Sequence, residues 1–146
     1  MDLLENLVNT DTDIREVFHI DTLGHILGNY MNTVQFFTFS TLIKEQLYLI
    51  LDCIVAFQKR NMNNITLSKS KLMTHAIVMG RFLYSVGYAY TQEQLIHICE
   101  QQNRYVIHIM EAQAQKQPAR VSTLFNEYYT HMMSFANVVY QLSRGS

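Results

Sequence analysis

The chain has 146 residues, of which 49% are hydrophobic and only 16% are charged. That length is typical of one domain with a single hydrophobic core, and the charged fraction lies well below the average of about 25% for globular domains. A net charge of −1 with scattered Lys and Arg residues excludes the basic surface that nucleic-acid binding needs. We therefore expect one domain over residues 1–146, with surplus apolar surface facing an internal cavity or a second copy of the chain.

The N-terminus and the most apolar stretch of the chain bear on the cellular location of the protein. Acidic residues stand at the N-terminus where a signal peptide would carry basic ones. The most apolar stretch, residues 36–57, is interrupted by charged side chains and is therefore a poor bilayer span. These observations predict a cytoplasmic protein. Cys53 and Cys99 lie in apolar patterns, which predicts reduced, buried thiols.

Helical periodicity begins early in the chain. A short helix is expected over residues 3–8, and a second one ends at about His19. Apolar residues then recur at three- and four-residue spacing from 23 to 34, as in a helix with one buried face. The same spacing continues over 36–57, and the pattern leaves open whether these segments are one helix or two.

The asparagine-rich segment 61–64 predicts a turn, because Asn side chains compete for backbone hydrogen bonds. Ser68 or Ser70 is then expected to cap a helix that reaches about Tyr90. That helix is apolar nearly all round, and a helix without a polar face belongs at the centre of a fold.

The last third of the chain shows clear helix-start signals. Thr91 followed by Gln94 fits a capping box, so a helix is expected from there toward Gln117. Pro118 is expected near the first turn of a last helix, where proline is tolerated. No segment shows strand alternation, so the fold class is all-α with five to seven helices. Bundles and globin-like folds both meet this description.

The six histidines do not show the spacing of a metal site, which disfavours a resident metal. His75 or His97 could be the axial ligand of a haem, since haem needs an imidazole that projects into an apolar slot. Ordinary structural histidines explain the same residues. No nucleophile motif or phosphate-binding glycine motif occurs, so the sequence gives no support to an enzyme.

The segment around Gly80, Arg81 and Gly87 is the most informative one. Each glycine weakens a helix by about 1 kcal/mol relative to Ala, so both are expected to allow close approach of another helix or of a ligand. Arg81 lies among apolar neighbours, where its guanidinium must reach water, pair with an acidic side chain or hold an anion. We expect Arg81, with His75, to bind a carboxylate or small anion at the mouth of an apolar channel.

Eight Met and eight Phe residues predict a soft interior that can adapt its shape. Core filling alone explains most of them. An apolar cavity closed by one cation would nevertheless suit a long-chain fatty acid, with walls for the tail and a charge-assisted bond for the head. The expected lining residues are Phe39, Ile43, Leu47, Met79, Leu83, Tyr84, Tyr128, Met132 and Phe135.

The helix around Gly80-Arg81-Phe82-Leu83-Tyr84, the restart at 90–91 and the tyrosines at 128–129 resemble the non-haem globin-like sensor domains of sporulation signalling in bacilli. Stand-alone members, the plasmid-encoded sporulation-inhibitory proteins of the anthrax bacillus, are similar in length. The resemblance implies a globin-like domain without haem or another cofactor, a tunnel that holds a fatty acid, a nearby halide ion such as chloride, and a homodimer. It also implies inhibition of sporulation by competition with a sensor histidine kinase for its signal.

Two other functions fit parts of the pattern. The central helix with Gly80-Arg81 loosely resembles viral-type Bcl-2-like interaction proteins, in which Arg81 would meet an Asp of an amphipathic partner helix. The chain lacks the Asn-Trp that precedes Gly-Arg in that family. The other alternative is a haem-binding globin that senses gas.

Overall fold

The computed structural model describes residues 31–87 and 89–144. Within these residues it is all-helical, as the sequence predicts. The helices are α4 (Thr33–Gln58), α5 (Met62–Val86), α6 (Gln92–Ala114) and α7 (Pro118–Arg144). The helices expected over 3–8, to His19 and over 23–34 lie outside the described residues, apart from the end of the last one.

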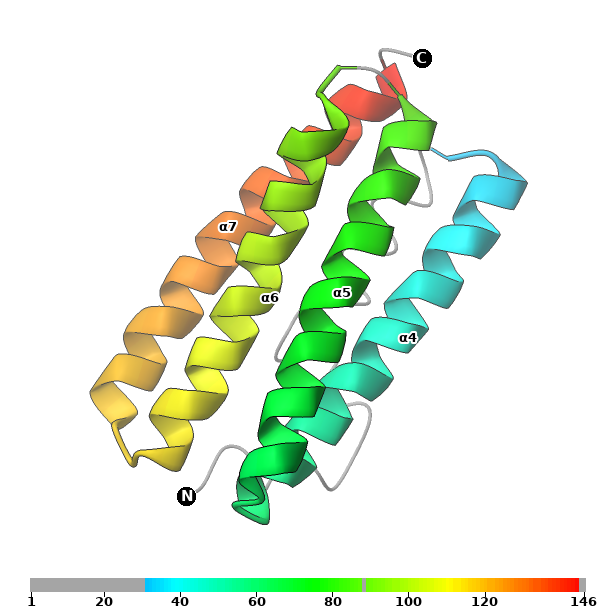
Figure 1. Ribbon diagram of the computed structural model, residues 1–146. Helices are drawn as coiled ribbons and strands as arrows, with labels where there is room; N and C mark the ends of the chain where they lie inside the picture. Colours follow the sequence, from blue (N-terminus) through cyan, green and yellow to red (C-terminus); the bar gives the residue numbers. More distant parts are fainter. Residues whose placement is uncertain (1–30, 88, 145–146) are drawn as a thin grey trace.

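The helices run side by side and alternate in direction, with short turns between them (Figure 1). α5 packs against α4 and α6, and α7 packs mainly against α6. This is the arrangement of an antiparallel helical bundle. The globin-like packing that the resemblance implies stays a prediction.

Helix starts follow the polar side chains that precede them. Asn32 caps α4 by a reciprocal capping box with Gln35. Thr91 and Gln94 form the predicted capping box of α6, with hydrogen bonds of 3.1 and 2.9 Å. Pro118 is the first residue of α7, as expected. These starts are local, since each needs only side chains within one turn of the backbone.

The start of α5 differs from the prediction. Asn61 is its N-cap, and the Asn61 side chain accepts a hydrogen bond from the Asn64 backbone at 3.1 Å. Residues 62–64 are therefore helical rather than part of a turn, and Ser68 and Ser70 lie inside the helix. The prediction was wrong because Asn serves equally well as a turn residue and as a cap.

The turns that end α4 and α6 use left-handed residues other than glycine. Arg60 and Lys116 have φ values of 53° and 56°. In each turn a backbone N–H beyond the helix reaches back to a helical carbonyl, Asn61 to Ala56 and Gln117 to Ala112. Because the usual glycine signal is missing, the sequence placed the end of α6 too late, near Gln117 instead of Ala114.

Gly80 and Gly87 mark two close approaches, as predicted. A Cβ at Gly80 would lie 2.6 Å from the Cα of Ile96 in α6. A Cβ at Gly87 would overlap the backbone carbonyl of Leu142 in α7. The glycines thus let the end of α5 meet the backbones of both following helices.

The core runs along all four helices and contains few polar groups. Its largest fully buried side chains are Phe39, Ile50, Ile54, Leu72, Leu83, Leu95, Ile109 and Met110. α5 is not apolar all round, however, because Lys71, Thr74 and Arg81 are exposed along its outer side. α5 therefore shares the interior with α6 rather than lying alone at the centre.

Candidate functional site

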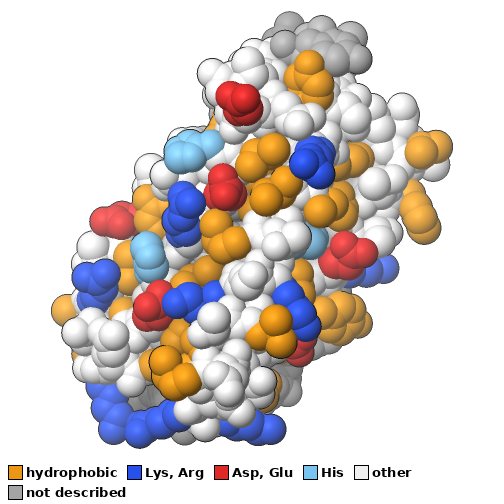
Figure 2. Space-filling model, viewed as in Figure 1, with side chains coloured by type: hydrophobic (Ala, Val, Ile, Leu, Met, Phe, Trp, Pro, Cys, Tyr) orange, Lys and Arg blue, Asp and Glu red, His pale blue; other side chains and the backbone are white. Residues whose placement is uncertain are grey.

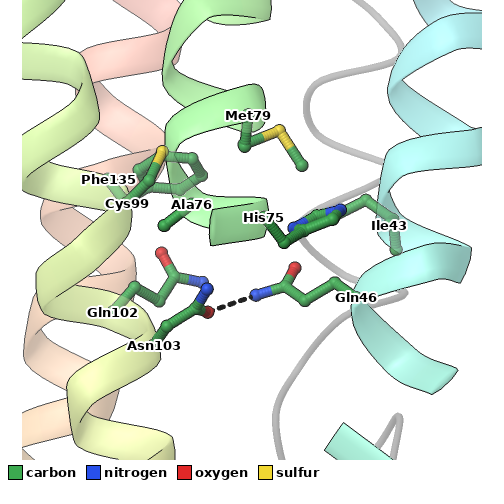
Figure 3. Close-up of a pocket in the computed structure, with 9 residues that line it drawn as sticks. All are labelled: Ile43, Gln46, His75, Ala76, Met79, Cys99, Gln102, Asn103 and Phe135. Atoms are coloured by element: carbon green, nitrogen blue, oxygen red, sulfur yellow. Dashed lines mark hydrogen bonds between the residues drawn. The ribbon is translucent and has the colours of Figure 1, made fainter. Parts of the chain in front are cut away.

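A small cavity lies where the four described helices face one another (Figure 3). Its volume is about 20 Å³, which is room for about one water molecule. The lining residues are Ile43 and Gln46 of α4, His75, Ala76 and Met79 of α5, Cys99, Gln102 and Asn103 of α6, and Phe135 of α7. The cavity is thus apolar on one side and amide-lined on the other.

Asn103 organises the amide side of the cavity. It is 1% exposed, and its Oδ1 accepts a hydrogen bond of 2.8 Å from Nε2 of Gln46 (Figure 3). Its Nδ2 donates to the backbone carbonyl of Leu72, also at 2.8 Å. One buried side chain therefore joins α4, α5 and α6, and both of its polar atoms are satisfied.

Two other polar side chains at the cavity have atoms without a partner. His75 is 6% exposed, and its ring lies beside the backbone carbonyl of Leu42 and 3.8 Å from the Glu45 carboxylate, but neither ring nitrogen makes a well-aligned hydrogen bond within the described part of the chain. Gln102 is 7% exposed and its side chain hydrogen-bonds to Tyr128, while its Oε1 has no partner among the described residues. An unsatisfied buried polar atom costs about 1–3 kcal/mol, so these atoms mark a place where a hydrogen-bonding guest is favoured.

His75 is neutral at pH 7. Burial lowers its pKa from the ordinary value of 6.5, while the carboxylate of Glu45 and the backbone carbonyl of Leu42 oppose this shift. Glu45 lies 3.8 Å from Nε2 of His75 and is exposed. The carboxylate is too distant and too well solvated to keep the ring charged.

The thiols near the core are protonated. Burial raises the pKa of Cys99, which lines the cavity, to about 12, and that of Cys53 to about 11. Both cysteines are free and buried, as predicted. Since the thiolate is the reactive form, neither sulfur is an activated nucleophile in this environment.

The predicted tunnel residues are brought together only in part. Ile43, Met79 and Phe135 line the cavity. The other predicted residues that are buried belong to the hydrophobic core and do not line the cavity: Phe39, Leu47, Leu83, Tyr128 and Met132. Tyr84 is on the surface, at 36% exposed.

The predicted pairing of Arg81 with His75 is not found. Arg81 is exposed, whereas His75 is buried at the cavity. The two residues are six positions apart on one helix, and with about 3.6 residues per turn they point to different sides. Arg81 therefore reaches water, which was the simpler interpretation of this residue.

Sequence reasoning missed the amide side chains of Gln46, Gln102 and Asn103. Gln102 and Asn103 continue the buried stripe of α6 between Cys99 and Val106, and this position was the available signal. Polar residues on a buried stripe need partners, but the partner Gln46 lies 57 positions away in the chain. The sequence alone does not give that pairing.

Residues 31–87 and 89–144 hold no group of three or more His, Cys, Asp or Glu side chains placed for a metal ion. The cavity beside His75 is far smaller than a haem, and His97 is exposed. None of the described helices is long and apolar enough to cross a membrane.

Comparison of the chain with protein-family models, curated proteins and solved structures finds no match.

Proposed function

We propose that this chain is a non-enzymatic, signal-binding domain that takes a small amphipathic molecule into the cavity between its helices. The observation that carries the proposal is a small cavity between the four described helices, at which Oε1 of Gln102 and the ring nitrogens of His75 make no hydrogen bond within the described residues. Buried polar atoms without a hydrogen bond cost free energy, so a guest that bonds to them stabilises the fold. Binding sites combine apolar walls with a few convergent polar groups in this way.

A ligand with a tail needs more room than the cavity offers, so the helices around it must separate on binding. Three methionines, Met79, Met110 and Met132, are buried in the core, and Met79 also lines the cavity. Methionine has flexible, unbranched side chains that repack readily. The core can therefore accept a tail by rearrangement, and such a rearrangement is a means of passing on a signal.

The resemblance to the sporulation sensor domains makes the proposal more specific. The ligand is then a fatty acid, with a halide ion such as chloride bound nearby. The protein is a cytoplasmic homodimer that inhibits sporulation by competing with a sensor histidine kinase for its signal. Arg81 is not part of this site, because it is exposed on a different side of α5 from His75.

The ligand proposal is tested on protein purified in its native state. An organic extract is analysed by mass spectrometry, and a visible absorption spectrum is taken of the same sample. We expect a co-purified amphipathic molecule in near-stoichiometric amount. An extract without any lipid, from protein that also fails to bind added fatty acid, would contradict the proposal. A Soret band would instead favour the gas-sensing globin.

A second candidate is an interaction protein that binds an amphipathic helix. The observation that favours it is the exposure of Arg81 beside Val78, which is 44% exposed on the same side of α5. Figure 2 shows other apolar side chains scattered between charged ones over the face in view. An amphipathic helical peptide with a central Asp would bind, and Arg81→Ala would weaken it at least tenfold more than Lys71→Ala does. Equal effects would contradict this candidate.

A further inference from the structure

We propose that the two turns at one end of the bundle form a basic surface, and that this surface binds the acidic residues 1–16 of the same chain. The inference goes beyond the proposed function, because it concerns the end of the bundle and not the cavity between the helices. We call this surface the basic end and define it by four side chains: Lys59, Arg60, Lys116 and Arg120.

The basic end gathers positive charge that is scattered in the sequence. Because the helices alternate in direction, the turn between α4 and α5 and the turn between α6 and α7 lie at the same end of the bundle (Figure 1). All four side chains of the basic end are exposed. The surrounding segments 57–65 and 113–123 contain no Asp or Glu. Figure 2 shows Lys and Arg side chains gathered at the lower end of the face in view.

Acidic side chains of the described helices do not neutralise the basic end. Glu111, in the last turn of α6, is 4.0 Å from Lys69 of α5. No carboxylate of the described residues lies within 4.0 Å of a basic-end nitrogen. The turn at the opposite end, residues 87–91, contains no charged residue. The two ends therefore differ in charge, and the basic end attracts an anionic partner.

The chain itself carries a segment of the opposite charge. Residues 1–30 contain six acidic side chains and one Arg, whereas residues 31–146 contain six acidic side chains and ten Lys or Arg. Five of the six acidic residues of the first segment stand within residues 1–16: Asp2, Glu5, Asp11, Asp13 and Glu16. The small net charge of the whole chain thus conceals an acidic beginning and a basic remainder.

The acidic residues are far enough along the chain to reach the basic end. The start of α4, which follows residue 31, lies at the end of the bundle opposite the basic end (Figure 1). The 26 residues of α4 span about 39 Å. Thirty residues span about 45 Å even at the short rise of a helix, and more when extended. Residues 1–30 can therefore run back along the bundle and bring their first acidic side chains to the basic end.

The tether favours the chain's own segment over other anionic partners. A tethered partner has an effective concentration in the millimolar range, which a free partner must exceed or outbind. A nucleic acid or an anionic membrane would also be repelled by the acidic residues of the same chain. Both must displace residues 1–16 before they contact the basic end.

The test uses a spin label on the full-length chain. Leu3→Cys places one reactive thiol at the start of the chain, since Cys53 and Cys99 are buried. At low salt we expect the label to at least halve the NMR amide signals of Asn61 and Gln117, at the basic end, and to leave Thr91, in the opposite turn, unchanged. The signals should recover at about 1 M salt, where the Debye length is about 3 Å. Equal loss at both ends, no loss at low salt, or a loss that salt does not reverse overturns the inference.

A matched pair of variants and a mixing experiment complete the test. Lys116→Glu with Arg120→Glu should restore the signals of Asn61 at low salt, whereas Lys44→Glu with Arg104→Glu, at exposed positions in the middle of α4 and α6, should not. Equal effects of the two pairs contradict the basic end. In a mixture, a spin-labelled chain should leave the signals of an isotope-labelled chain without a spin label unchanged. Loss of signal there would show that the acidic segment binds a second copy, which overturns the intramolecular contact.

Discussion

Burial lowers the pKa of His75 and of His131, and this makes the stability of the fold depend on pH. Both groups bind protons more weakly in the folded chain than in the unfolded one. Their contribution to the free energy of unfolding is therefore fully present above the unfolded pKa of about 6.5, and it is lost as the pH falls below that value. The slope is at most about 1.4 kcal/mol per pH unit for each histidine.

We expect the melting temperature to fall between pH 7 and pH 5.5, before most carboxylates titrate. His75→Leu should make this fall shallower, since the buried group that resists protonation is gone. His108→Leu serves as the control and should leave the slope unchanged. Thermal unfolding followed by circular dichroism measures all three. A wild-type melting temperature that rises on acidification would show that the sign is wrong.

Gly80 gives a second prediction at the scale of one residue. Alanine is the better helix former by about 1 kcal/mol, so an unconstrained site would be stabilised by Gly80→Ala. Here the added Cβ would lie 2.6 Å from Cα of Ile96, a contact that only a shift of α5 against α6 relieves. We expect a loss of about 1–3 kcal/mol, measured by urea unfolding. Thr74→Ala, at an exposed position of the same helix, should be neutral or stabilising. A stabilised Gly80→Ala would contradict the close approach.

The register of three helices depends on Asn103. Its side chain bonds to Gln46 of α4 and to the backbone of α5, and it is almost fully buried. Asn103→Leu keeps a similar volume but leaves the Gln46 amide without its partner. We expect a loss of about 1–3 kcal/mol in urea unfolding. Asn137→Leu, on the exposed side of α7, is the control and should change stability little. Equal stability of the two variants would mean that the network does not hold the helices.

The positions of the helices were largely predictable, and the site was not. Caps such as Thr91 with Gln94, and the start at Pro118, depend on neighbours within one turn, so the sequence shows them directly. The cavity depends on side chains from four helices, and a periodic pattern does not say which stripes meet. Arg81 stands among apolar residues in the sequence, which suggested a buried anion site, but helical geometry turns its side chain toward solvent.

The low charge of the chain raises the question of assembly for the molecule as a whole. On α4, Val34 and Phe37 are 75% and 74% exposed and lie one turn apart. If the proposed homodimer forms through this face, Phe37→Ser should shift the protein from dimer to monomer in sedimentation velocity. Leu67→Ser, which removes an exposed apolar side chain of α5, should not. A wild-type protein that stays monomeric at high concentration would contradict the homodimer.

The central claim is that the interior of this bundle, and not its surface, receives the ligand. Amide chemical shifts recorded by NMR during a titration with 1-octanol test it most directly. If the ligand enters the cavity, we expect saturable shifts at residues that surround it, led by Ala76, Cys99 and Asn103. Shifts confined to exposed positions such as Phe37 and Leu67, with the cavity amides unmoved, would contradict it.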